Sequence, residues 1–310
     1  MNVYRSLDEF RELPNAVVTS GTFDGVHRGH QVILDRLREV ARATGGESVV
    51  LTYWPHPRAV VSDTTEVKLL STIEEKTELL AQQDVDHLLV IPFTRDFSEL
   101  TSEQFIQQVL VERIGTRRLV IGYDHRFGRN REGGFEHLSQ NAARYGFAVE
   151  EIPRQDVDNV GVSSSKIRTA LLEGNVRTAT EYLGRYYNLS GVVVKGNQLG
   201  RTIGYPTANL HPPEPYKLVP ADGVYAVRVQ ANGQTHGGMM NIGIRPTIHG
   251  THRTSEVNIF DFDADIYGQE ITVFFIDKIR NEQRFNGIEA LKAQLHEDKE
   301  TALKMLGNAS

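Results

Sequence analysis

The chain has 310 residues, a formal net charge of −6 and no cysteine. This length suffices for two domains with separate cores, because single hydrophobic cores usually stop growing somewhat below it. The lack of cysteine excludes disulfides, thiolate catalysis and cysteine-ligated zinc. The acidic balance argues against nucleic acid as a partner, because surfaces that follow a phosphate backbone carry a basic excess.

The first 13 residues alternate charged with isolated apolar side chains, so they lack the apolar core of a secretion signal. No stretch of the sequence approaches the roughly 20 apolar residues that span a bilayer. We therefore expect a cytoplasmic protein that does not bind membranes.

Strand-like and helix-like patterns alternate through the first half of the chain. Apolar residues 16–18 predict a strand, and helical spacing after it predicts a helix from His30 that ends at Gly45. Further strands are predicted over residues 48–53, 88–91 and 119–121, and further helices over residues 74–83 and 102–113. This order predicts a parallel sheet with helices on both faces and with ligands at the carboxyl ends of its strands.

The pattern changes in the second half. Two short helices are predicted over residues 163–173 and 175–183, with the serines at 163–165 supplying an N-cap. After about Tyr187, short β-branched runs lie between Gly, Asn and Asp turns, at residues 192–194, 224–229, 257–260 and 271–276. These runs predict a small antiparallel barrel. A final helix over residues 288–305 is expected to cover one face of the barrel with Leu291, Leu295 and Leu303.

Residues 21–30 read Gly-Thr-Phe-Asp-Gly-Val-His-Arg-Gly-His and join the first strand to the first helix. Glycines at such a junction let backbone N–H groups approach an anion, and the start of the helix adds positive partial charge. His27 and His30 are three residues apart, so both imidazoles can donate to phosphoryl oxygens. The pattern therefore indicates a phosphate site. The alternative is a tight turn with two solvated histidines.

This ten-residue string resembles the bacterial flavin adenylyltransferases, which are nucleotidyltransferases with a His-x-Gly-His signature. The resemblance implies that His27 and His30 contact the phosphates of ATP and act in catalysis. It also implies that the surrounding turn binds ATP through Gly21, Phe23, Asp24, Gly25 and Gly29. For Asp24, a turn acid that accepts local N–H groups is the alternative.

Two later segments are similar to other motifs of the same family. Residues 162–168 resemble its Ser-Ser-Thr-x-x-Arg segment, which implies that Ser164 and Arg168 hold the departing pyrophosphate. A helix cap and a surface charge are the alternative for these two residues. Residues 122–128 resemble a loop that lines the flavin and nucleotide pocket, which implies lining roles for Asp124 and Phe127. His125 stands where an aromatic residue is usual.

The second dense motif covers residues 196–209. Its glycines, together with Lys195 and Arg201, indicate a phosphate-binding loop, and Thr207 and Asn209 offer two hard oxygens that suit Mg²⁺. A glycine-rich hairpin is the alternative. Pro-Thr-Ala-Asn after such a loop resembles the riboflavin kinases. The resemblance implies ATP or flavin binding by Lys195, Gly196, Gly200, Arg201, Gly204, Pro206 and Asn209.

Glu256 begins a strand-like run and is the candidate carboxylate that accepts the proton of an attacking hydroxyl group. A solvated residue on a strand face is the alternative. Residues 241–247 are similar to a further loop of the riboflavin kinases, which implies that Arg245 lies near the flavin and nucleotide. Ile248 stands where an aromatic residue is common.

Together these motifs are similar to those of the bifunctional riboflavin kinase and FAD synthetase family. The resemblance implies a Rossmann-like adenylyltransferase domain at residues 1–186 and a β-barrel kinase domain at residues 187–310. Riboflavin and ATP would give FMN in the barrel, and FMN and ATP would give FAD in the first domain, both with Mg²⁺. Two alternatives are a nucleotidyltransferase of other specificity with a degenerate second domain, and a flavin-binding carrier. The sequence leaves the oligomeric state open.

Overall fold

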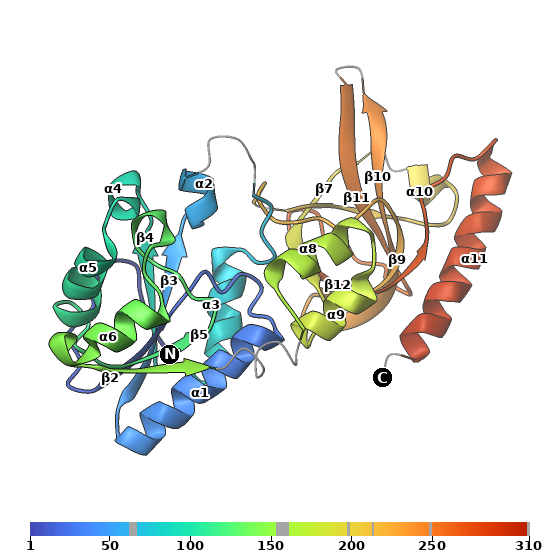
Figure 1. Ribbon diagram of the computed structural model, residues 1–310. Coiled ribbons are helices and arrows are strands. Elements are labelled where there is room, and N and C mark those ends of the chain that lie inside the picture. Colours follow the sequence, from blue (N-terminus) through green and yellow to red (C-terminus); the bar gives the residue numbers. More distant parts are fainter. Residues whose placement is uncertain (62–66, 153–160, 197–198, 213, 248–249, 309–310) are drawn as a thin grey trace. The chain divides into compact units, whose positions relative to one another are not determined.

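A computed structural model describes the chain apart from residues 62–66, 153–160, 197–198, 213, 248–249 and 309–310. The side chains of residues 199, 245–247 and 250–252 are also not described. The chain divides into two compact units, Met1–Ser164 and Ser165–Ser310 (Figure 1). Helices α8 (Ser164–Leu172) and α9 (Val176–Leu183) therefore fall almost entirely in the second unit. The domain boundary after residue 186 stays a prediction.

Within its described residues, the first unit contains a six-stranded sheet in the order β1-β4-β3-β2-β5-β6. Every neighbouring pair is parallel, which confirms the predicted α/β architecture. The strands are β1 (Asn2–Tyr4), β2 (Ala16–Ser20), β3 (Glu47–Trp54), β4 (His87–Pro92), β5 (Thr116–Gly122) and β6 (Ala148–Ile152). The edge strands β1 and β6 are not among the predicted strands. They carry exposed or half-buried residues, which weaken the apolar signal.

Both faces of this sheet are buried, because its central strands are apolar at consecutive positions. Val18 and Leu51 belong to the core cluster on one face, whereas Val17 and Val50 belong to the cluster on the other. The helical segments of the unit are η1 (Leu7–Glu9), α1 (Arg28–Thr44), α2 (Pro57–Val61), α3 (Ile73–Ala81), α4 (Arg95–Ser98), α5 (Ser102–Gln104), η2 (Phe105–Val111), η3 (Arg129–Arg131) and α6 (Phe135–Tyr145). Helix α1 ends as predicted, with Gly45 in the left-handed conformation.

The helix predicted over residues 102–113 is correct in place but not in type. Only α5 is α-helical, and the π-helix η2 follows it directly. The wider π turn brings Phe105, Ile106, Val109 and Leu110 into the core together. Helical periodicity cannot reveal this, because the same spacing of apolar residues also fits an α-helix.

The second unit contains a closed antiparallel barrel in the order β10-β11-β8-β7-β12-β9, as predicted. Its strands are β7 (Asn188–Val194), β8 (Ala208–His211), β9 (Gly223–Ala231), β10 (Gln234–Thr247), β11 (Gly250–Ile259) and β12 (Glu270–Arg280). A short helix, α10 (Leu199–Thr202), lies between β7 and β8. Figure 1 shows that β10 and β11 continue together beyond the other strands of the barrel.

Helix α11 (Ile288–Gly307) packs on the barrel with a face that differs partly from the prediction. Leu295 packs against the core cluster that includes Ala302, and Asp298 is buried on the same face. Leu303, by contrast, is 49% exposed. Residues 295, 298 and 302 follow helical spacing, so Leu303, next to Ala302, turns about 100° away from the barrel.

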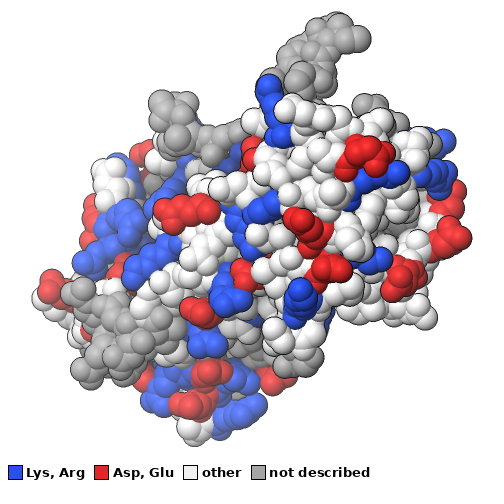
Figure 2. Space-filling view, turned by 90° about the vertical axis from the view of Figure 1, so that its right-hand side faces the viewer, with Lys and Arg blue, Asp and Glu red and all other residues white. Residues whose placement is uncertain are grey.

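None of the helices in the described part of the chain combines the length and apolar character needed to cross a membrane. On the face seen in Figure 2, basic and acidic side chains are interspersed.

Helix α1 positions the first site, so its packing can be tested by itself. Leu37 is fully buried between α1 and the sheet, and Leu37→Ala is expected to lower the free energy of unfolding by about 2–5 kcal/mol. Arg42→Ala, on the exposed side of the same helix, is the matched control, with a change within about 0.5 kcal/mol. Trp54 is the single tryptophan and lies in β3, so its fluorescence during urea unfolding reports this unit. Equal losses in both variants would contradict the packing described here.

Candidate functional site

The first site lies where the strand order of the parallel sheet reverses. From β2 the chain adds β3 and β4 on one side, and β5 then pairs on the other side of β2. Ligands of open α/β sheets bind at the carboxyl ends of the strands at such a switch point. The segments after β2 and β5 meet there, because Ser20 Oγ and His125 Nε2 are 2.8 Å apart. The structure thus brings two of the predicted motifs together.

The turn after β2 has an unusual backbone. Phe23, Gly25 and Val26 have φ values of 46°, 79° and 39°, which place all three in the left-handed region. This conformation suits glycine but strains a β-branched residue such as Val26. Packing holds the turn, because Phe23 and Val26 are buried in the core. A Cβ atom added to Gly21 would lie 3.2 Å from the Phe23 ring, so this position is also crowded.

The histidine pair stands at the start of α1. His27 is the N-cap, and its Nδ1 accepts the backbone N–H of His30 at 3.3 Å. The two imidazole rings stack with centroids 3.6 Å apart and 15° between their planes. His27 is buried and His30 is half-buried. The helix therefore begins two residues before the predicted start, with Gly29 buried in its first turn.

Asp24 is buried inside the turn and anchors it to a distant segment. Its carboxylate accepts the backbone N–H of Leu70 at 2.9 Å and that of Ser71 at 3.2 Å. The Ser71 hydroxyl in turn accepts the N–H of Gly25 at 3.1 Å. Asp24 thus fastens the turn to residues outside it, rather than only capping local N–H groups. Binding of ATP by Asp24 stays a prediction.

Lys76 is a buried cation near Asp24 that the sequence analysis did not single out. Its side chain, on α3, is 2% exposed and donates to Thr52 Oγ1 at 3.4 Å. Burial lowers the pKa of Lys76 to about 8, against the opposing effect of the Asp24 charge. A signal was present, because Lys76 lies between Ile73 and Leu80 on the buried face of its helix.

Ser164 also reaches the turn, because its hydroxyl donates to the backbone carbonyl of Asp24 at 3.2 Å. Arg168 follows one helical turn later on α8 and is half-buried. It belongs to the second unit, so its action at the first site stays a prediction.

The loop after β5 carries Asp124, His125 and Phe127. Asp124 is exposed, whereas Phe127 is buried against Phe105, with ring centroids 5.4 Å apart. Burial lowers the pKa of His125 to about 4, and the nearby charges of Arg131 and Arg126 act in the same direction. His125 is therefore neutral around pH 7 and serves as a hydrogen-bonding link to Ser20. Ligand contacts of Asp124 and Phe127 stay predictions.

The second site is built on the barrel, where three predicted residues come together. Glu256 on β11 pairs with Asn209 on β8 in the strand register. Thr207 Oγ1 lies 3.5 Å from Glu256 Oε2. Glu256 is 8% exposed, so its carboxylate is not a solvated surface group. The Pro206 carbonyl accepts Asn258 Nδ2 at 2.7 Å, which holds the segment before β8 against β11.

The glycine segment before β8 approaches these residues closely. A Cβ atom at Gly196 would lie 2.2 Å from Asn209 Nδ2, and one at Gly200 would lie 2.2 Å from the Tyr205 carbonyl oxygen. Any other residue would clash with backbone at position 200 and would displace the Asn209 side chain at position 196. Gly204 has a φ of 85° and is exposed, as are Lys195 and Arg201.

Two cavities meet at Thr207. The Arg201 cavity has a volume of about 400 Å³, and the Glu256 cavity has a volume of about 200 Å³. The Arg201 cavity is lined by Arg201, Pro206, Thr207, Asp263, Asp265 and Tyr267, among others. The Glu256 cavity is lined by Ile203, Thr207, Met239, Asn241, Glu256 and Leu295, among others. Thr207 lines both cavities, so the two adjoin at its side chain.

The oxygen donors around Thr207 fit a magnesium ion. A hydroxyl, an amide oxygen and a carboxylate are hard ligands, and Mg²⁺ usually takes few of these from the protein and the rest from phosphates and water. The described residues contain no group of three or more His, Cys, Asp or Glu side chains that could hold a metal by themselves. The Arg245 backbone pairs with His252, but its side chain and Ile248 lie outside what the structure describes.

The α/β unit with its glycine-rich turn at a helix start, and the barrel with a buried carboxylate in one of two adjoining cavities, are typical of a two-domain transferase that acts on phosphate compounds. The model of the FAD synthetase family matches residues 9–166, and that of the riboflavin kinase family matches residues 183–306. The chain belongs to the family of bifunctional riboflavin kinase/FMN adenylyltransferases.

Similar proteins extend over nearly the whole chain. The bifunctional riboflavin kinase/FMN adenylyltransferase of Escherichia coli K12 is 38% identical over 99% of this chain and 98% of its own length. The protein of the same name from Listeria monocytogenes is 39% identical over 94% of this chain and 93% of its own length.

A crystal structure titled as a macrolide-efflux protein from Streptococcus pneumoniae has a similar fold. It superposes with a TM-score of 0.85 at 30% identity, covering 97% of each chain. The architecture of both units therefore recurs in a solved structure. The name of that protein refers to macrolide efflux, and this role is ascribed to that protein alone.

Lys76 gives a pH-dependent prediction for the first unit. Because its pKa falls from the usual 10.5 to about 8 on folding, the unfolded chain binds the additional proton between these values. Stability should therefore rise with pH across this window, by at most about 1.4 kcal/mol per pH unit. Lys76→Met should lack this rise when urea unfolding is followed by Trp54 fluorescence. Parallel pH profiles for the two proteins would show that Lys76 is not the responsible group.

Proposed function

We propose that the two units catalyse successive steps of flavin nucleotide synthesis. The second unit transfers a phosphoryl group from ATP to riboflavin and forms FMN. The first unit transfers an adenylyl group from ATP to FMN and forms FAD and pyrophosphate. One observation carries this proposal: each unit is matched by the model of the corresponding enzyme family over a segment that contains its candidate phosphate site.

In the first unit, a phosphate oxygen of FMN attacks the α-phosphorus of ATP. Negative charge then grows on the phosphoryl oxygens, and the chain's task is to align the reactants and stabilise this charge. The first turn of α1 supplies the backbone N–H groups that the His27 cap leaves available, and His27 and His30 add imidazole donors there. Ser164 and Arg168 hold the departing pyrophosphate in this proposal.

In the second unit, the riboflavin hydroxyl attacks the γ-phosphorus of ATP and Glu256 accepts the hydroxyl proton. Glu256 lines the smaller cavity, whose apolar side chains include Ile203, Met239 and Leu295. We therefore place the flavin there. Arg201 lines the larger cavity, so we place ATP in it, with the γ-phosphate near Thr207.

Mg²⁺ is expected at Thr207 and Asn209, where it would neutralise phosphate charge when bound. A cytoplasmic location and the absence of a nucleic-acid partner stay predictions from the sequence.

A direct assay separates this function from its alternatives. The protein is incubated with riboflavin, ATP and Mg²⁺, and the flavins are resolved by chromatography. FMN followed by FAD is the expected result. Formation of FMN without FAD would contradict the adenylyltransferase assignment. FAD formed only from added FMN would indicate a degenerate second unit. No conversion of either flavin would favour a flavin-binding carrier.

His30→Ala is expected to lower FAD formation from FMN by roughly 10²-fold, the scale of losing one preorganised charge-stabilising group. FMN formation from riboflavin on the same chain should not change, which makes the second unit an internal control. Both rates are measured by chromatography of the flavins. Equal loss of both activities in a folded variant would contradict the assignment of His30 to one site.

Glu256→Gln keeps the side-chain shape but removes the proton acceptor. FMN formation should fall by roughly 10²-fold or more, and Glu256→Ala should give a loss of similar size. FAD formation from added FMN should be preserved in both variants. A Glu256→Gln variant with wild-type kinase activity would exclude Glu256 as the base.

A further inference from the structure

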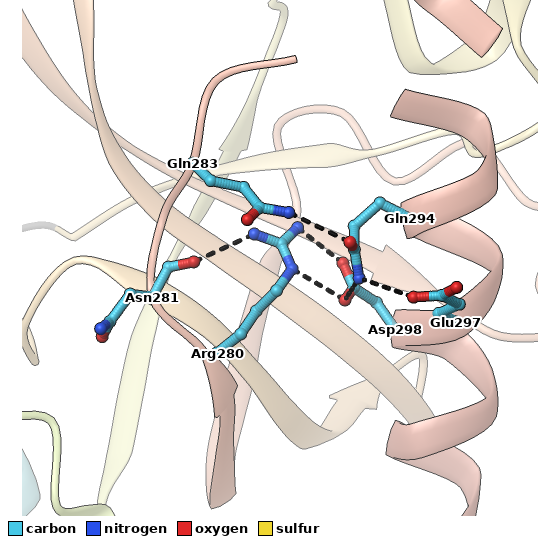
Figure 3. A network of polar contacts seen from close by, with 6 residues as sticks. All are labelled: Arg280, Asn281, Gln283, Gln294, Glu297 and Asp298. Carbon is cyan, nitrogen blue, oxygen red and sulfur yellow. Dashed lines mark hydrogen bonds and ion pairs between the residues drawn. The ribbon is translucent and has the colours of Figure 1, made fainter. Parts of the chain in front are cut away.

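An ion pair that no assigned role explains joins the barrel to its terminal helix. Arg280, at the end of β12, donates from Nε to Asp298 Oδ1 at 2.8 Å and from Nη2 to Oδ2 at 2.7 Å. This two-point geometry defines distance and orientation together. Asp298 on α11 is 1% exposed, so the pair is shielded from water on the helix side. Figure 3 shows the guanidinium group facing the helix across this contact.

The same pair anchors the segment between β12 and α11. Arg280 Nη1 donates to the Asn281 carbonyl at 3.0 Å, and Gln294 Nε2 donates to Asp298 Oδ1 at 3.1 Å. Gln283 Nε2 then donates to Gln294 Oε1 at 3.0 Å (Figure 3). Residues 281–287, which we call the wall segment, are thus joined to α11 directly by the Gln283–Gln294 bond and indirectly through Arg280, which binds both Asn281 and Asp298.

This network forms one side of the Glu256 cavity. Arg280 and Asp298 line the cavity, and so do Gln283 and Phe285 of the wall segment. The guanidinium group of Arg280 also lies 5.5 Å from the centre of the Phe285 ring. Glu256, carried by the barrel strand β11, lines the same cavity.

A second contact sets the wall segment against the barrel. A Cβ atom at Gly243 would lie 1.9 Å from Glu282 Oε1, so the Glu282 carboxylate rests directly on the β10 backbone. The wall segment therefore has defined neighbours on both the helix and the strand.

We propose that Arg280 and Asp298 are positioning residues for riboflavin phosphorylation. They set the wall segment and α11 at the distance from Glu256 that the flavin ring requires. This inference rests on the proposed function, which places riboflavin in the Glu256 cavity. A buried ion pair stabilises a fold poorly compared with apolar packing, so its directional geometry is its main contribution here. Neither residue needs to touch the reacting atoms.

The test uses the full-length chain with Arg280→Lys and Asp298→Asn. Lysine keeps the positive charge but cannot donate two parallel hydrogen bonds as the guanidinium group does. Asparagine keeps the shape of aspartate but loses its negative charge. In both variants the KM for riboflavin should rise by about tenfold or more. This is the size of losing one charge-assisted hydrogen bond, here the bond between Arg280 and Asp298 that holds the wall segment in place. The KM for ATP and the rate of FAD formation from FMN should stay within about twofold of wild type. Riboflavin binding without turnover, measured by flavin fluorescence with ADP, should weaken in parallel.

Asp277→Asn is the matched control, because Asp277 lies on the same strand, pairs with Arg177 and lines neither cavity. It should leave the KM for riboflavin unchanged. Gln283→Ala removes only the bond from the wall segment to Gln294 and should raise this KM by about threefold. This milder variant preserves the buried pair, so it tests the inference even if Asp298→Asn fails to fold.

Equal increases in the KM for both substrates, or an unchanged KM for riboflavin in folded variants, would overturn the inference. A wild-type chain that forms no FMN would instead overturn the proposed function. The two failures are therefore distinguishable.

Discussion

The first site depends on the buried carboxylate of Asp24, because the turn that carries the histidine pair has a strained backbone, with Phe23 and Val26 in the left-handed region. Hydrogen bonds from the Leu70 and Ser71 backbone hold this carboxylate, and Ser164 binds its main-chain oxygen. Strain of this kind persists only where surrounding contacts over-determine the conformation. The contacts come from segments far apart in the sequence, so the phosphate-type turn is a property of the whole unit and not of its ten residues alone.

The second site depends on strand register. Glu256 stands opposite Asn209 because β11 and β8 pair at that position, and a slip by one residue would turn the carboxylate to the other face of the barrel. The glycines before β8 then allow the loop backbone to lie against Asn209 without a clash. Closure of the barrel maintains this register, since it leaves β8 and β11 no unpaired edge along which to shift.

The sequence predicts what depends on local patterns. The alternation of strand-like and helix-like segments predicts the parallel sheet that the structure contains, and the glycine-rich motifs predict residues that it brings close together in each unit. Features set by distant contacts were not predicted. Asp24 has partners from another segment, Lys76 and Asp298 occupy buried helix faces, and Leu303 is exposed on a helix whose apolar face is narrow. Periodicity can mark a charged residue on a buried helix face, as it does for Lys76, but it cannot identify the partner of that charge, because the partner lies elsewhere in the chain.

The cap that His27 forms has a chemical consequence. A ring nitrogen that accepts the N–H of His30 cannot carry a proton, so a neutral His27 must hold its hydrogen on Nε2. The peptide group of the helix thereby selects the tautomer before any substrate arrives. With Nδ1 engaged by the helix, Nε2 is the ring nitrogen of His27 from which a hydrogen bond to a phosphate oxygen can be donated.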